Sequence, residues 1–166
     1  MSVIPDVAYQ IVEKRLRQRG KQLKKAEEAV RRARERATDT SAPAGNTGGG
    51  RGRNTSSRVE RGALNVIRAE KRLEYVRRWE AVVRKVDEVY PPDDSSEGFV
   101  ASMIYGNGMS QADLARAGGC SRQTVKLRQD RYVIRAAFLA AQAGLIREEV
   151  SESGDPDQAE RGFEAN

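Results

Sequence analysis

The stretch MSQADLARAGGCSRQTVKLR, residues 109–128, contains two short runs of helical character separated by a pair of glycines. Each run opens with a serine, Ser110 or Ser121, and serine is a favoured residue for capping a helix N-terminus. Gly118 and Gly119 supply the backbone freedom that a tight turn needs. The sequence therefore predicts a helix that begins after Ser110, a glycine turn, and a second helix that begins after Ser121.

The small and apolar residues of this stretch are spaced so that the second helix packs on the first. The spacing of Ala115, Gly119 and Val125 is that of a helix-turn-helix. In this motif the second helix enters the major groove of DNA, and side chains near its N-terminus touch base edges. The alternative interpretation is an ordinary connection between two helices, with the charged residues on a solvated surface.

The second helix carries the side chains that duplex DNA recognition requires. Arg122 is suited to a two-pronged contact with guanine, and Gln123 to a contact with adenine. Hydroxyl groups and basic side chains at the two helix starts are suited to phosphate. The predicted DNA-binding residues are Ser110, Gln111, Ser121, Arg122, Gln123, Thr124, Lys126, Arg128 and Arg131.

The chain resembles known transcription proteins in this region. The run SRQTVKLRQDR, preceded by MSQADLA and by a segment with Phe99 and Tyr105, resembles the promoter-reading helix-turn-helix of bacterial sigma factors. The wider layout is similar to phage late-gene transcriptional regulators of the RinA/ArpU type. Those proteins join an N-terminal helical part to a C-terminal sigma-like helix-turn-helix, with a glycine-rich element after the first helix. Here that element is NTGGGRGRN, residues 46–54.

This resemblance implies an activator of late phage operons, including packaging genes, that acts with host RNA polymerase. Two positions depart from the pattern. Gly118 stands where a leucine is usual, and Gln129 stands where sigma-like modules often have an apolar residue.

The whole chain is expected to be all-α, with long, coiled-coil-like helices followed by the C-terminal helix-turn-helix domain. We predict a basic N-terminal helix over 1–37, a glycine-rich linker over 38–56 and a long amphipathic helix over 57–90. The helix-turn-helix domain then covers 91–147, and an acidic, disordered tail covers 148–166. The apolar stripe of the first helix is narrow, so it needs a partner helix from this chain or from another copy. We therefore expect a homo-oligomer that associates through the long helices.

The charge of the chain favours a polyanionic partner. The 166 residues carry a net charge of +6 and give a pI near 9.7. From Arg147 onward, seven acidic and two basic residues give a net charge of −5, which leaves +11 for the rest of the chain. Double-stranded DNA is the partner that best fits this balance.

Composition excludes several classes of function. The chain has no histidine and a single cysteine, Cys120, which rules out a histidine-based triad and a zinc site with histidine or all-cysteine ligands. Asp93 and Asp94 fit a proline-rich turn without any metal. We therefore expect no enzyme activity, no catalytic residues, no cofactor and no metal. The lone cysteine and the lack of a signal peptide or an apolar membrane span indicate the cytoplasm.

Two questions stay open from the sequence. The glycine-rich segment is a flexible linker or an arm that enters a minor groove through Arg51 and Arg53, while a phosphate-loop motif is incomplete there.

The function we favour is a sequence-specific transcriptional regulator. The alternative is a small terminase subunit, which recognises DNA for packaging, although its DNA-binding part usually comes first in the chain. A structural or RNA-binding coiled-coil protein is the third possibility.

Overall fold

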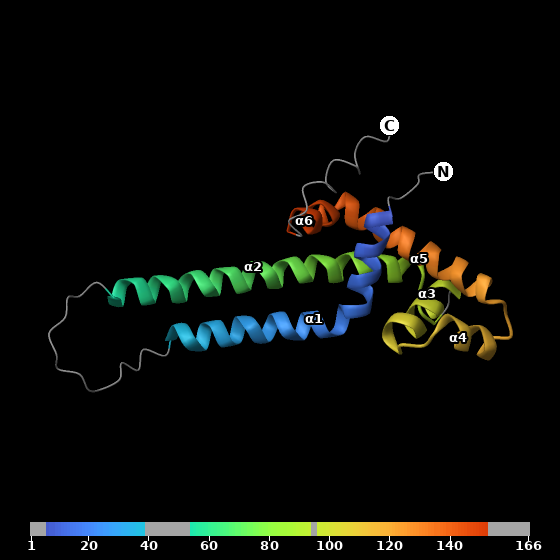
Figure 1. Cartoon of the computed structure of the whole chain (residues 1–166), viewed down its shortest axis with the longest axis horizontal. Coiled ribbons are helices and arrows are strands. Elements are labelled where there is room, and N and C mark those ends of the chain that lie inside the picture. Colours follow the sequence, from blue (N-terminus) through green and yellow to red (C-terminus); the bar gives the residue numbers. More distant parts are fainter. Residues whose placement is uncertain (1–5, 39–53, 94–95, 153–166) are drawn as a thin grey trace. The chain divides into compact units, whose positions relative to one another are not determined.

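The computed structural model describes residues 6–38, 54–93 and 96–152, and every regular element in these ranges is helical (Figure 1). The all-α prediction is confirmed for this part of the chain. None of the described helices has the length and apolar character needed to cross a lipid bilayer. The elements are α1 (Asp6–Thr38), α2 (Asn54–Val89), α3 (Ser96–Ala101), a π-helical turn η1 (Ser102–Gly106), α4 (Gln111–Ala117), α5 (Arg122–Gln142) and α6 (Leu145–Glu152).

The helices are longer than predicted at three ends. Helix α1 continues to Thr38 and α2 already begins at Asn54, so both extend into the predicted linker over 38–56. Helix α2 ends at Val89, as expected from the two prolines that follow it. Helix α6 extends to Glu152, so the first residues of the predicted acidic tail are helical rather than disordered. The possible DNA arm with Arg51 and Arg53 lies outside the described residues.

The described chain divides into two compact units, and residues 20–77 form one of them. In this unit the second part of α1 and the first part of α2 run side by side (Figure 1). Ala26 and Val30 of the α1 stripe are buried, and Arg34 Nη2 donates a hydrogen bond of 2.7 Å to Glu70 Oε1. The partner helix that the narrow stripe of α1 requires is thus supplied by α2 of the same chain.

The second unit comprises the described residues 6–19, 78–93 and 96–152. Most of its buried side chains come from the first turns of α1, the last turns of α2, and α5 with α6. Small and β-branched residues dominate, which lets the helices approach closely. The buried residues of these four segments include Ala8, Val12, Leu16, Trp79, Val82, Val83, Val86, Val133, Ala136, Ala137, Ala140 and Leu145.

A smaller apolar cluster in the same unit joins α3, η1, α4 and the start of α5. Four partly buried side chains, Met103, Tyr105, Met109 and Cys120, pack around it. The cluster fixes the first turn of α5 against the three short elements that precede it, α3, η1 and α4. Its buried members are Val100, Ile104, Leu114, Ala115 and Val125.

Candidate nucleic-acid interface

The predicted helix starts at Ser110 and Ser121 are confirmed. The Oγ of Ser110 accepts a hydrogen bond of 3.1 Å from the backbone N–H of Asp113, and the Oγ of Ser121 accepts one of 3.0 Å from that of Thr124. Both serines have extended backbone geometry, as N-cap residues do. The two caps fix where α4 and α5 begin, and they leave both serines exposed.

The turn between the two helices is built from the predicted glycines. Gly118 ends α4, and its N–H donates a hydrogen bond of 2.9 Å to the carbonyl of Leu114. Gly119 has φ +60°, in the left-handed region that favours glycine. The N–H of Cys120 then donates to the carbonyl of Ala115 at 3.1 Å, which returns the chain toward α4. A leucine at position 118 would place its Cβ 3.2 Å from the Leu114 carbonyl oxygen, a contact that glycine avoids.

The predicted base-contacting residues project from the N-terminal part of α5. Arg122, Gln123 and Lys126 are exposed, whereas Thr124 and Arg128 are partly buried. Arg131 is also exposed, and its Nη1 donates a hydrogen bond of 3.1 Å to Glu97 Oε1 on α3. The structure therefore groups the first three of these side chains at the helix start and directs Arg131 to a neighbouring helix.

Sequence reasoning missed Leu127, which is 55% exposed in the middle of this surface. At helical spacing, Leu127 lies one turn after Gln123 and one turn before Arg131. The apolar residues of α5 that are buried, such as Val125 and Val133, occupy the other side of the helix. An apolar side chain on this face can contact the methyl group of thymine. The signal in the sequence is an apolar residue that lies outside the helical spacing of the buried residues of α5.

Gln129 is the centre of a buried polar network that the sequence did not predict. It is 3% exposed, and its Oε1 accepts a hydrogen bond of 2.6 Å from Gln111 Nε2. Its Nε2 lies 2.7 Å from the hydroxyl of Tyr105 and 3.2 Å from Glu13 Oε1, and donates to both. The polar residue at this position is therefore satisfied, because its partners come from three different helical segments.

Gln111 links that network to the exposed start of α5. Its Oε1 accepts a hydrogen bond of 3.4 Å from the Nε of Arg122, while its Nε2 is held by Gln129. Both polar atoms of the Gln111 side chain are thus engaged within the protein. The contact of Gln111 with DNA stays a prediction, and the structure adds that its side chain accepts a hydrogen bond from Arg122.

Glu13 and Arg17, on the first turns of α1, also border this surface and were not among the predicted residues. Arg17 Nη2 donates a hydrogen bond of 2.8 Å to Glu13 Oε1, and the guanidinium lies 5.8 Å from the centre of the Tyr105 ring. The hydrogen bond to Glu13 raises the pKa of Arg17. Burial raises the pKa of the Tyr105 hydroxyl. Arg17 therefore stays charged and Tyr105 neutral over the physiological pH range.

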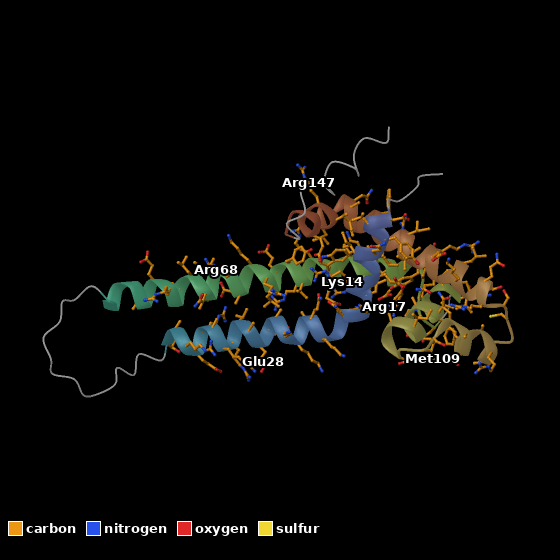
Figure 2. The ribbon with its side chains drawn as sticks, in the orientation of Figure 1. Lys14, Arg17, Glu28, Arg68, Met109 and Arg147 are labelled. Carbon is orange, nitrogen blue, oxygen red and sulfur yellow. The ribbon has the colours of Figure 1, made fainter. Side chains whose placement is uncertain are left out.

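A shallow pocket of about 330 Å³ lies where these groups meet. Side chains from α1, η1, α4 and α5 line it, together with the two residues that precede α4, Met109 and Ser110. Arg17 and Met109 are labelled in Figure 2. The polar residues of the lining are Arg17, Ser110, Gln111, Arg122 and Gln129.

Hydrogen bonds between tyrosines and aspartates hold α5 against the other two long helices of this unit. Tyr9 of α1 donates to Asp130 Oδ1 at 2.6 Å, and Tyr132 donates to Asp87 Oδ1 of α2 at 2.5 Å. Asp87 also pairs with Arg19 at 3.2 Å. Each of the two tyrosine–aspartate hydrogen bonds joins α5 to a residue far away in the sequence. In the part of the chain that the structure describes, no group of three or more metal-ligating side chains comes together.

Comparisons with known proteins give no match for this chain among protein-family models, curated proteins or solved structures.

Proposed function

We propose that the chain is a sequence-specific regulator of transcription that binds double-stranded DNA through a helix-turn-helix formed by α4, the Gly119 turn and α5. The observation that supports this most strongly is the first turn of α5. It is capped by Ser121, fixed to α4 through the apolar cluster, and presents the exposed side chains of Arg122, Gln123 and Lys126. A rigid helix start with hydrogen-bond donors toward solvent is what direct readout of base edges requires.

The residues have separate roles in this proposal. Arg122 and Gln123 read bases, and Leu127 contacts an apolar base edge. Lys126 and Arg128 contribute positive charge toward the phosphate backbone. Gln111, held by the buried Gln129, fixes the direction of Arg122.

We further propose that the protein activates late phage genes together with host RNA polymerase, in the cytoplasm of a bacterial host. This part is supported by the resemblance of SRQTVKLRQDR and the glycine-rich element to the RinA/ArpU type of regulator. The proposal includes no enzymatic step.

Self-association through the long helices is also proposed. Three large apolar side chains of α2 in the 20–77 unit, Val59, Leu64 and Ile67, are between 46% and 69% exposed. A second copy that covers them would hold two recognition helices at a fixed spacing, which predicts a repeated or palindromic operator.

A footprint on the DNA around the coding region, with and without host RNA polymerase, tests this function. A protected site just upstream of an operon, extended when polymerase is added, is the expected result. Protection near a packaging start that does not change with polymerase would assign the chain to the small terminase class instead. Weak, uniform protection that disappears at modest salt would contradict sequence-specific binding.

A further inference from the structure

We propose that Arg17 of α1 binds a backbone phosphate of the same DNA duplex whose bases α5 reads, so that the N-terminal helix forms part of the DNA-binding surface. The ligand is a phosphodiester oxygen, and the inference rests on the proposed DNA-binding function. Arg17 lies more than ninety residues before the predicted DNA-binding residues, and no sequence pattern connects it with them.

The pocket beside α4 brings two guanidinium groups to the same place. Arg17 and Arg122 both line it. Arg122 stands at the start of the helix proposed to enter the major groove. A phosphate group on the rim of that groove is therefore placed to meet a cation from α1 as well as one from α5. Two arginines provide the charged N–H donors that phosphate oxygens accept.

Arg17 is held ready for such a contact. Its side chain keeps 58% of its surface exposed, while that of its partner Glu13 keeps 28%. The Tyr105 ring supports one side of the guanidinium. The side chain therefore loses little conformational freedom when a ligand binds, because its position is already restricted in the free protein.

Glu13 does not prevent phosphate from binding. Its Oε1 accepts hydrogen bonds from two donors, Arg17 and the buried Gln129. If Arg17 turns toward a phosphate, the carboxylate keeps the hydrogen bond from Gln129. A guanidinium has five N–H groups in all, so Arg17 is able to keep its hydrogen bond to Glu13 and to bind phosphate at the same time.

The test compares Arg17→Gln with Lys14→Gln. Lys14 is exposed on the same helix, three residues away, and is outside the lining of the pocket, so both variants lose one positive charge from α1. DNA affinity is measured for a specific and a random duplex across a series of salt concentrations. Each phosphate contact contributes about 0.9 to the slope of log affinity against log salt concentration.

We expect Arg17→Gln to lower that slope by about 0.9 on both duplexes and Lys14→Gln to leave it close to the wild-type value. The loss of affinity between about 50 and about 200 mM salt then becomes about threefold to fourfold smaller for Arg17→Gln. Arg17→Lys should restore most of the slope, because it keeps the charge. The preference for the specific duplex should stay unchanged in all three variants, whose folding is checked by thermal unfolding.

Two results would overturn the inference, and they are distinguishable. If the wild-type chain binds the specific duplex and Arg17→Gln behaves like Lys14→Gln, the phosphate contact is absent while the proposed function stands. If the wild-type chain binds neither duplex, the proposed function fails and the contact fails with it. A methylphosphonate scan adds a direct readout: one neutralised phosphate should weaken wild-type binding and leave the affinity of Arg17→Gln unchanged.

Discussion

Gln111 Nε2 and Gln129 Oε1 are joined by a hydrogen bond of 2.6 Å that connects the first residue of α4 to the buried side of α5. Gln111 in turn accepts from Arg122, the first residue of α5. A buried amide is thus linked to an exposed arginine through a single intermediate side chain.

Replacing Gln129 with leucine is expected to destabilise the protein. The substitution leaves Gln111 Nε2 without its acceptor and removes the donor that serves Tyr105 and Glu13, and an unsatisfied buried polar group costs about 1–3 kcal/mol. The free energy of unfolding, from urea titration, should fall by that amount. Equal or greater stability of Gln129→Leu would show that the network contributes nothing to folding.

Leu127→Ala is expected to weaken recognition and leave folding unchanged. The side chain is 55% exposed, so its truncation should change the free energy of unfolding by less than about 0.5 kcal/mol. Discrimination against one base pair of the preferred site should fall by roughly 1 kcal/mol, the lower end of the usual cost of a mismatch. Binding to the preferred and the altered duplex, measured in parallel, checks this. Unchanged discrimination would remove Leu127 from the reading surface.

Gly98 and Gly20 form a matched pair for the effect of alanine. A Cβ at Gly98 would lie 2.2 Å from the carbonyl oxygen of Tyr90, so Gly98→Ala should cost about 3 kcal/mol or more. Gly20 lies within α1 with no atom near the position of an added Cβ, so Gly20→Ala should stabilise the protein by roughly 0.5–1 kcal/mol. Thermal unfolding should show that Gly98→Ala is less stable, and Gly20→Ala more stable, than the wild-type chain. A mild effect of Gly98→Ala would contradict the close approach of α3 to the backbone of Tyr90.

Stability is expected to fall in alkaline solution. Burial raises the pKa of Tyr9, Tyr105 and Tyr132 above the ordinary value of 10.0, and hydrogen bonds to Asp130 and Asp87 raise those of Tyr9 and Tyr132 further. The folded state therefore holds these protons more tightly than the unfolded chain. The stability that this provides is present below pH 10 and is lost as the pH rises above it.

Tyr132→Phe should make that alkaline loss of stability shallower, because one of the three groups no longer titrates. Urea unfolding at a series of pH values from 8 upward (about half a unit apart) would measure it. The same slope for Tyr132→Phe and the wild-type chain would mean that this tyrosine does not contribute to the pH dependence.

The sequence predicted the features that depend on local chemistry. The serine caps of α4 and α5, the glycine turn at positions 118 and 119 and the inward-facing Ala115 and Val125 could all be predicted from residue type and spacing. These features involve hydrogen bonds and contacts over a few residues. The all-helical character followed in the same way from composition and periodicity.

The sequence could not predict the groups that depend on distant contacts. Gln129 is satisfied by Glu13, which is 116 residues away, and a lone glutamine in a helix gives no sign of such a partner. In the sequence, Arg17 is one of many basic residues of the first helix. Only the packing of α1 near α4 places it beside the pocket and so distinguishes it from the others. Gly98 is required because the backbone at Tyr90 returns close to it, which sequence spacing does not reveal.

Selection from a pool of random DNA duplexes, carried out with the wild-type chain and with the Arg122→Ala, Gln123→Ala double variant, tests most directly whether α5 reads DNA sequence. We expect the wild-type chain to enrich one motif, and the double variant to retain salt-sensitive binding while losing preference at the base pairs that these two side chains contact. Enrichment of the same motif by both proteins, or of no motif by the wild-type chain, would contradict recognition through the start of α5.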